Sequence, residues 1–297
     1  MMGKYSIKEL EQLSGIKAHT IRIWEKRYSL INPQRTDTNI RFYSDEDLKK
    51  IINVSLLNSN GFKISKIAEM SDEAISQKVL ELSDRQSDHS LHINQLVLSM
   101  VQLDEKKFET ALSGFFLRYN FEQTMTEIVY PFLRKTGVLW QTHNISPAQE
   151  HFISNLIRQK IIVGIDSLPL QSENSKSAIL FLPESELHEI GLLFSHYLLR
   201  KAGFRTIYLG QAVPHRDLLS VFLEYKPDIL VTSLTTALPR SAVSQYLHQL
   251  SRDFPCRRIL VSGLQVENVE DQDVPNPVIV IHSISAFQNH ISEMSFV

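Results

Sequence analysis

The chain has 297 residues, of which 43% are hydrophobic and 22% charged, which is ordinary for a globular protein of two or three domains. No apolar run reaches the roughly 18 residues that a membrane span requires, and the chain starts with a patterned helix, not a signal-peptide apolar core, so we expect a cytoplasmic protein without a membrane partner. The single Cys256 excludes an internal disulfide and a thiolate metal site.

The net charge of −2 conceals an asymmetry along the chain. Residues 1–70 carry 12 lysines and arginines against 8 acidic residues, a net charge of +4, so the remainder has a net charge of −6. A cationic segment on an anionic body suits a domain that reads DNA, because the body is not itself drawn to phosphate.

The first residues show helix-turn-helix spacing. Ser6 and Glu9 form a capping-box pair that predicts the start of a short helix, and Gly15 ends it. After a turn, a second helix directs Ile21 and Trp24 inward and has the dimensions of a helix that enters the major groove. A turn-rich stretch around residues 33–43 then predicts a basic wing between short extended segments, before a further helix capped by Ser44 and Asp47.

Several residues in this segment resemble the winged helix-turn-helix of MerR-type regulators over roughly residues 4–70. They are Tyr5-Ser6-Ile7, Leu10, Thr20-Ile21-Arg22, Trp24-Glu25, Arg27-Tyr28, Pro33, Arg35, Arg41 and Tyr43-Ser44. The alternative is a solvated helical face followed by a charged loop. The resemblance implies that double-stranded operator DNA is the partner. It implies base-edge contacts near Lys17, His19 and Thr20 and phosphate contacts by Arg22, Arg35, Arg41 and Tyr43. The helical period of the second helix by itself predicts largely outward positions for Lys17, His19, Thr20, Arg22, Lys26 and Arg27.

Residues 71–165 show helical periodicity without strand alternation, which predicts a helical bundle. The expected helices are 73–87, 91–102, 104–118, 120–137 and 147–164. Ser146, Pro147 and Gln149 supply an N-cap, a first-turn proline and a capping-box glutamine, so the last helix should begin there.

Trp140 is followed after nine residues by Glu150 and His151. This spacing resembles the upper-face motif of the cobalamin-dependent photoreceptor repressors, a MerR-type subgroup that senses light through adenosylcobalamin. The resemblance implies that Trp140 packs over the adenosyl group and that Glu150 and His151 line the same pocket. The alternative is a core tryptophan beside a surface Glu-His pair.

One residue departs from the pattern of that subgroup. A histidine there directly follows the tryptophan and can become the upper cobalt ligand after light removes the adenosyl group, whereas this chain has Gln141. His143, two residues on, is either its replacement or an ordinary loop residue. The resemblance therefore does not extend to capture of cobalt by a second histidine.

From Ser177 the chain alternates short apolar runs with helical stretches. The expected strands are 178–182, 205–209, 229–232, 258–261 and 278–281, and the expected helices are 187–202, 214–225, 239–253 and a final helix. Such alternation builds a parallel sheet covered by helices on both faces, and ligands bind such sheets at the carboxyl ends of the strands.

Three motifs fall at those strand ends. They are Glu186-Leu187-His188-Glu189-Ile190-Gly191, Ser233-Leu234-Thr235 and Ser262-Gly263. Together they resemble the cobalamin-binding pattern Asp-x-His-x-x-Gly, Ser-x-Leu, Gly-Gly. The resemblance implies that His188 binds cobalt from below and Glu186 orients it, that Ser233 and Thr235 line the channel for the nucleotide tail, and that Gly263 permits close backbone approach. Glu186, Thr235 and Ser262 depart from the pattern, which affects the expected affinity and not the fold.

Other cofactors fit less well. His188 and Glu189 lack the second histidine of a His-Glu-x-x-His zinc motif, and no Gly-x-Gly-x-x-Gly loop follows the first strand, which disfavours a nicotinamide cofactor. A loop histidine without these surrounding motifs would simply be solvent-exposed.

We therefore expect a multidomain chain. Its parts are a winged helix-turn-helix at 1–72, a helical bundle at 73–170 that caps the upper face of the corrinoid, and an α/β Rossmann-like parallel-sheet domain at 171–297. The predicted function is that of a non-enzymatic, cobalamin-responsive and light-sensing repressor, in which adenosylcobalamin or another cobalamin form holds a DNA-binding dimer or tetramer together. The alternatives are a corrinoid carrier of a methyltransferase or mutase, and a regulator whose cobalamin pocket has lapsed.

Overall fold

A computed structural model describes residues 5–35, 39–85, 89–141, 145–236, 239–267 and 269–295. The chain forms two compact units, Met1–Asn155 and Leu156–Val297. Within the described ranges, no helix is long and apolar enough to cross a membrane.

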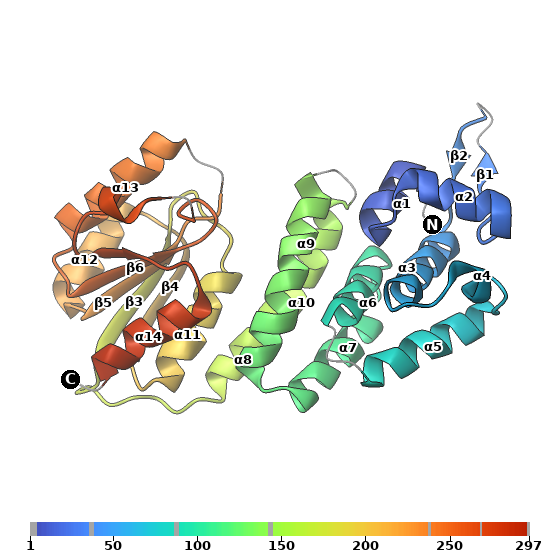
Figure 1. Ribbon diagram of the computed structural model, residues 1–297. Helices are drawn as coiled ribbons and strands as arrows, with labels where there is room; N and C mark the ends of the chain where they lie inside the picture. The colour runs from blue at the N-terminus through green and yellow to red at the C-terminus, as the bar shows by residue number, and fades with distance from the viewer. Residues whose placement is uncertain are drawn as a thin grey trace. The chain divides into compact units, whose positions relative to one another are not determined.

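The first unit begins with the predicted helix-turn-helix and wing (Figure 1). The Ser6–Glu9 capping box is present, and Gly15 ends the first helix with a φ of 77°, a conformation that glycine adopts without strain. Ser44 and Asp47 form a second capping box, as predicted. The elements are α1 (Ile7–Ser14), α2 (Ala18–Tyr28), the antiparallel pair β1 (Gln34–Arg35) and β2 (Arg41–Phe42), α3 (Asp45–Ser59) and α4 (Ile64–Ile67).

Helices α5–α10 follow, and they confirm the predicted helical region. One predicted helix was too short: the helix expected at 120–137 continues to Gln141, so Trp140 lies inside it. The elements are α5 (Asp72–Arg85), α6 (His89–Val101), α7 (Glu105–Arg118), α8 (Phe121–Thr124), the π-helix η1 (Met125–Val129), α9 (Tyr130–Gln141) and α10 (Pro147–Asp166).

The second unit contains a five-stranded parallel sheet in the order β4-β3-β5-β6-β7. All five predicted strands are present, and the 3-10 turn η2 (Asp271–Asp273) precedes the last of them. They are β3 (Ser177–Pro183), β4 (Arg205–Val213), β5 (Ile229–Ser233), β6 (Arg258–Ser262) and β7 (Val278–Val280). The helices are α11 (Ile190–Lys201), α12 (His215–Tyr225), α13 (Arg240–Asp253) and α14 (Ile284–Ser295).

Figure 1 shows α12 and α13 on one face of this sheet and α11 and α14 on the other. Phe181, Leu218, Leu247 and Ile259 belong to one buried apolar cluster that joins the strands to α12 and α13. From β3 the chain goes first to β4 on one side and then returns to β5 on the other side. The switch point of the sheet therefore lies between β3 and β5, where the carboxyl ends of these two strands lie side by side.

Candidate functional site

Glu186 is the centre of a hydrogen-bond network at the carboxyl end of β3. Its side chain is only 3% exposed. Oε1 accepts hydrogen bonds from the His188 backbone N–H at 3.0 Å and the Thr236 hydroxyl at 2.9 Å, and Oε2 accepts from the backbone N–H groups of Thr235 at 2.6 Å and Thr236 at 2.7 Å. Burial alone would raise the pKa of this carboxyl, but the bonds from His188, Thr236 and Thr235 lower it well below its usual value. Glu186 is therefore a buried carboxylate anion near neutral pH.

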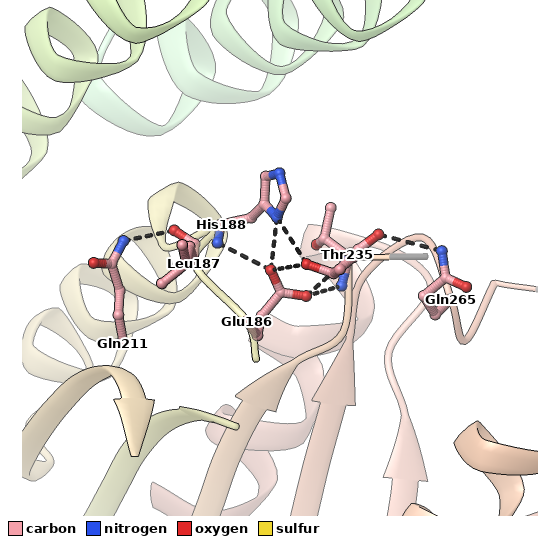
Figure 2. A network of polar contacts seen from close by, with 7 residues as sticks. Glu186, Leu187, His188, Gln211, Thr235 and Gln265 are labelled. Carbon is pink, nitrogen blue, oxygen red and sulfur yellow. Dashed lines mark hydrogen bonds and ion pairs between the residues drawn. The ribbon is translucent and has the colours of Figure 1, made fainter. Parts of the chain in front are cut away.

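His188 stands above this carboxylate with its side chain 61% exposed. Its Nδ1 lies 2.6 Å from Glu186 Oε1, and Figure 2 shows the ring directed away from the strands. A carboxylate can only accept, so the neutral imidazole keeps its proton on Nδ1, and Nε2 carries the lone pair. This carboxylate–imidazole arrangement is the one that orients metal-ligating histidines and makes them more basic.

Glutamines brace the loops around Glu186. The Gln211 side-chain amide donates to the Leu187 carbonyl at 2.5 Å, and the Gln265 amide donates to the Thr235 carbonyl at 3.2 Å (Figure 2). The Gln265 bond fixes the peptide group between Thr235 and Thr236, whose N–H donates to Glu186. Strand β4 and the loops after β5 and β6 thus all support the loop that carries His188.

Gly263 has the close backbone approach predicted for it. Its φ is +107°, and a Cβ built there would lie 2.4 Å from the Leu234 carbonyl oxygen and 2.8 Å from the Leu234 nitrogen. The Leu234 N–H also donates to the Ser262 carbonyl at 2.8 Å. Only glycine fits this contact between the loops after β5 and β6.

The other predicted residues of this unit lie at the same edge in different roles. Ser233 is a 4% exposed strand residue, the Ser262 hydroxyl donates to the Thr232 carbonyl at 3.4 Å, and Thr235 uses its backbone N–H on Glu186. A Cβ on Gly191 would meet nothing within 4 Å, so the structure gives no steric reason for glycine there.

A cavity of about 180 Å³ opens beside Glu186. Leu234 and Thr236 line it, whereas Ser233 and Thr235 do not. The channel role of these two residues stays a prediction. Sequence reasoning missed Thr236, Gln211 and Gln265, because their contacts are made by loops distant in sequence. Among the described residues, no group of three or more His, Cys, Asp or Glu side chains could hold a metal ion.

In the first unit, Trp140 lies in the last turn of α9 with 51% of its surface exposed, so the alternative of a buried core tryptophan is wrong. In the first turns of α10, His151 Nδ1 lies 2.7 Å from Glu150 Oε2. Gln149 fixes this helix start, because it closes the predicted capping box with Ser146 and donates to the Val101 carbonyl at 2.9 Å. His143 lies outside the described residues.

Helix α2 has the predicted buried and exposed faces. Ile21 and Trp24 are buried, and Thr20 is half-buried. The exposed candidates are Lys17, His19, Arg22, Lys26 and Arg27, with Arg35 and Arg41 on the wing strands. Their side chains are thus accessible to a partner.

Tyr43 differs from the prediction of a phosphate contact. It is 0% exposed, and its hydroxyl donates to Glu25 Oε2 at 3.2 Å. Burial, then the Glu25 charge, raises the pKa of Tyr43 to about 12, so the hydroxyl keeps its proton. Because Glu25 also pairs with Arg41 at 3.6 Å, Tyr43 helps to hold the wing on α2 and does not itself present a surface to DNA.

Comparison with protein families gives two matches. Residues 5–74 match the family described as MerR HTH family regulatory protein, and residues 92–163 match the family described as B12 binding domain. The second match covers α6–α9 and most of α10, so it falls on the helical region that carries Trp140, Glu150 and His151.

Two relatives from Myxococcus xanthus extend over most of the chain. The HTH-type transcriptional repressor CarH is 28% identical and the alignment covers 88% of this chain and 87% of CarH, while the HTH-type transcriptional repressor CarA is 26% identical with coverages of 87% and 86%. The monomethylamine corrinoid protein of Methanosarcina barkeri shares the fold, with a TM-score of 0.53, 14% identity, and coverage of 66% of this chain and 94% of that chain.

Proposed function

We propose that this chain, a homologue of CarH and CarA that joins a MerR-type DNA-binding domain to a B12-binding domain, is a repressor whose DNA binding is controlled by adenosylcobalamin and light. It is a regulator and not an enzyme. The bound cofactor holds a dimer or tetramer together, and this assembly binds operator DNA through the DNA-binding domains of several subunits at once.

The observation that carries the cofactor assignment is the pairing of His188 with Glu186. A half-exposed imidazole with Nδ1 fixed by a buried carboxylate supplies one nitrogen ligand, which suits a metal whose other positions are filled by a macrocycle. In this proposal His188 binds cobalt through Nε2, Glu186 sets its tautomer, and the loops braced by Gly263 keep Glu186 in place.

The upper-face assignment rests on Trp140, Glu150 and His151. A tryptophan with half its surface exposed presents a large flat apolar side chain to a partner, and the Glu150–His151 pair at the start of α10 can form hydrogen bonds with polar groups. We assign these residues to the adenosyl group. Cobalamin supplies a cobalt–carbon bond that light can break, and loss of the adenosyl group would remove the surface that Trp140 covers.

The proposed DNA contacts rest on the exposed cationic side chains of α2 and the wing. Lys17, His19 and Thr20 are assigned to base edges, and Arg22, Arg35 and Arg41 to phosphates. Each DNA-binding domain makes few phosphate contacts, so a single domain binds the operator with only modest affinity. Dissociation of the assembly would therefore cost orders of magnitude in operator affinity.

The test is to mix purified protein with adenosylcobalamin in the dark, record its visible spectrum, and repeat after illumination. An operator fragment is first selected from a random-sequence DNA pool. Sedimentation and fragment binding are then measured on the same dark and illuminated samples. We expect a coloured dark complex of larger mass, and a lit sample of smaller mass with weaker binding.

Two variants separate the parts of the proposal. His188→Ala should weaken cofactor binding and change the cobalt spectrum, whereas Trp140→Ala should keep the lower ligand and weaken the dark assembly. Equal mass and equal DNA affinity in dark and light would refute light sensing and leave a light-independent regulator. A protein that stays colourless would indicate a lapsed pocket, and a coloured protein that selects no DNA would indicate a corrinoid carrier.

A further inference from the structure

Glu189, directly after His188, is a second buried carboxylate in this loop. The residue is 8% exposed, although its neighbour His188 faces solvent. A carboxylate buried to this extent requires charged or hydrogen-bonding partners, because an unpaired buried charge is strongly destabilising. Its partners therefore show what the loop is attached to.

Glu189 is bound by one residue of a helix and one of a strand. The Arg158 Nε of α10 donates to Glu189 Oε1, and the Tyr208 hydroxyl of β4 donates to Oε2 at 3.1 Å. Burial, then the Glu189 charge, raises the pKa of Tyr208 well above its usual value, so the hydroxyl keeps its proton and donates a hydrogen bond to Glu189. The two bonds join α10, the loop and β4.

Tyr208 is itself held rigidly. Its ring stacks on His196 of α11 with centroids 5.1 Å apart and an interplanar angle of 13°. His196 Nε2 lies 2.9 Å from the Thr206 hydroxyl on the same strand as Tyr208. The hydroxyl that binds Glu189 thus comes from a side chain fixed by the sheet and by α11.

Helix capping does not explain the Glu189 carboxylate. Glu189 occupies the N-cap position of α11, where an acidic side chain commonly accepts a backbone N–H bond, yet its side chain makes no such bond. Its carbonyl alone starts the helix, accepting from the Leu193 N–H at 2.8 Å. The carboxylate is directed to Arg158 and Tyr208 instead.

We propose that Glu189, with Arg158 and Tyr208, is a positioning unit for His188. The segment 186–189 is held at one end by Glu186, in the middle by the bond from Gln211 to the Leu187 carbonyl, and at the other end by Glu189. The backbone of His188 lies between fixed points, so its ring is presented to a metal without a loss of loop entropy on binding. This inference rests on the proposed cobalt ligation by His188.

The test uses Tyr208→Phe, which removes one hydroxyl, and Glu189→Gln, which removes the charge. Glu184→Gln is the matched control, because Glu184 is an exposed carboxylate in the same loop. The probe is cobalt(II) cobinamide, which lacks the nucleotide tail, so any axial nitrogen must come from the protein. We expect both variants to bind it about tenfold more weakly and to lose the splitting that an axial nitrogen imposes on the cobalt(II) EPR lines.

A second readout uses the protein without cofactor. The His188 backbone N–H donates to Glu186, so its hydrogen exchange, followed by NMR, reports the order of the loop. Exchange should be faster in Tyr208→Phe and Glu189→Gln than in the wild type and in Glu184→Gln, with unchanged exchange in the strands of the sheet.

Unchanged exchange of the His188 amide in Tyr208→Phe would overturn the positioning role, as would retention of the nitrogen splitting in that variant. If the wild-type complex lacked the nitrogen splitting in its EPR spectrum and bound cobinamide no better than His188→Ala, cobalt ligation by His188 would be overturned. The hydrogen exchange of the His188 amide would then decide by itself whether Glu189 and Tyr208 hold the loop. Failure of Glu189→Gln to fold leaves Tyr208→Phe as the deciding variant.

Discussion

Replacing Glu186 by glutamine changes one oxygen to nitrogen in a group that accepts from five donors. The amide must direct its NH2 either to the Thr235 and Thr236 N–H groups or to His188. The first choice leaves two buried backbone donors without an acceptor, at about 1–3 kcal/mol each. We therefore expect the amide oxygen to stay on Thr235 and Thr236, and the NH2 to face His188.

That orientation reverses the imidazole tautomer. The NH2 group can only donate, so Nδ1 of His188 becomes the acceptor and the ring proton moves to Nε2. A protonated Nε2 cannot bind a metal, and loss of the orienting carboxylate typically costs 10–100-fold in metal affinity. The His188 backbone N–H also loses its acceptor, so the free energy of unfolding should fall by about 1–3 kcal/mol.

The assay has three parts. The ¹⁵N shifts of the His188 ring identify the tautomer in the cofactor-free protein, titration with cobinamide gives the affinity, and urea unfolding gives the stability. Glu184→Gln serves again as the control, since its exposed carboxylate lies in the same loop. It should leave all three quantities at wild-type values.

An Nδ1–H tautomer that persists in Glu186→Gln would refute this reasoning, and so would wild-type affinity for cobinamide. A loss of stability without a change of tautomer would mean that Glu186 only holds the loops together. A change of tautomer without a change of affinity would mean that His188 is not the ligand.

Three further predictions follow from other parts of the structure. Gly263→Ala combines a positive φ with a clash against the Leu234 backbone, so we expect a loss of about 3 kcal/mol or more in urea unfolding, together with weaker cobinamide binding. Burial, and then the Arg200 charge, lowers the pKa of His196 to about 4 from 6.5, so the unfolded chain binds more protons between these values and stability falls as pH falls. The free energy of unfolding should fall by about 2 kcal/mol by about pH 5 in the wild type, and this fall should be absent in His196→Phe. An equal dependence of the unfolding free energy on pH in the two proteins would contradict the prediction. Arg22→Ala should weaken DNA binding for all sequences and reduce the salt slope by about 1, with cofactor loading unchanged, whereas wild-type salt dependence would exclude Arg22 as a phosphate contact.

Local signals in the sequence were sufficient to predict most of the helices and strands. The capping pairs Ser6–Glu9, Ser44–Asp47 and Ser146–Gln149 fix where three helices begin, because each pair satisfies backbone N–H groups within one turn. The alternation of apolar strands and helices likewise gave the parallel sheet, since each pattern depends only on neighbours along the chain. The helix expected at 187–202 begins only at Ile190, because residues 186–189 form the loop that is held by distant partners.

The sequence by itself also brought His188, Glu186 and Gly263 to the carboxyl edge of the sheet, because strand order and motif spacing determine which loops meet there. Only the tertiary structure showed which hydrogen bonds join these loops to one another. Thr236, Gln265 and Tyr208 reach their partners across 50, 30 and 19 residues of sequence, and no local pattern records such pairings. The burial of Tyr43 is a related case. It directly follows a strand of only two residues, which has no period to show which face is buried, and only its packing and its bond to Glu25 of α2 decided this.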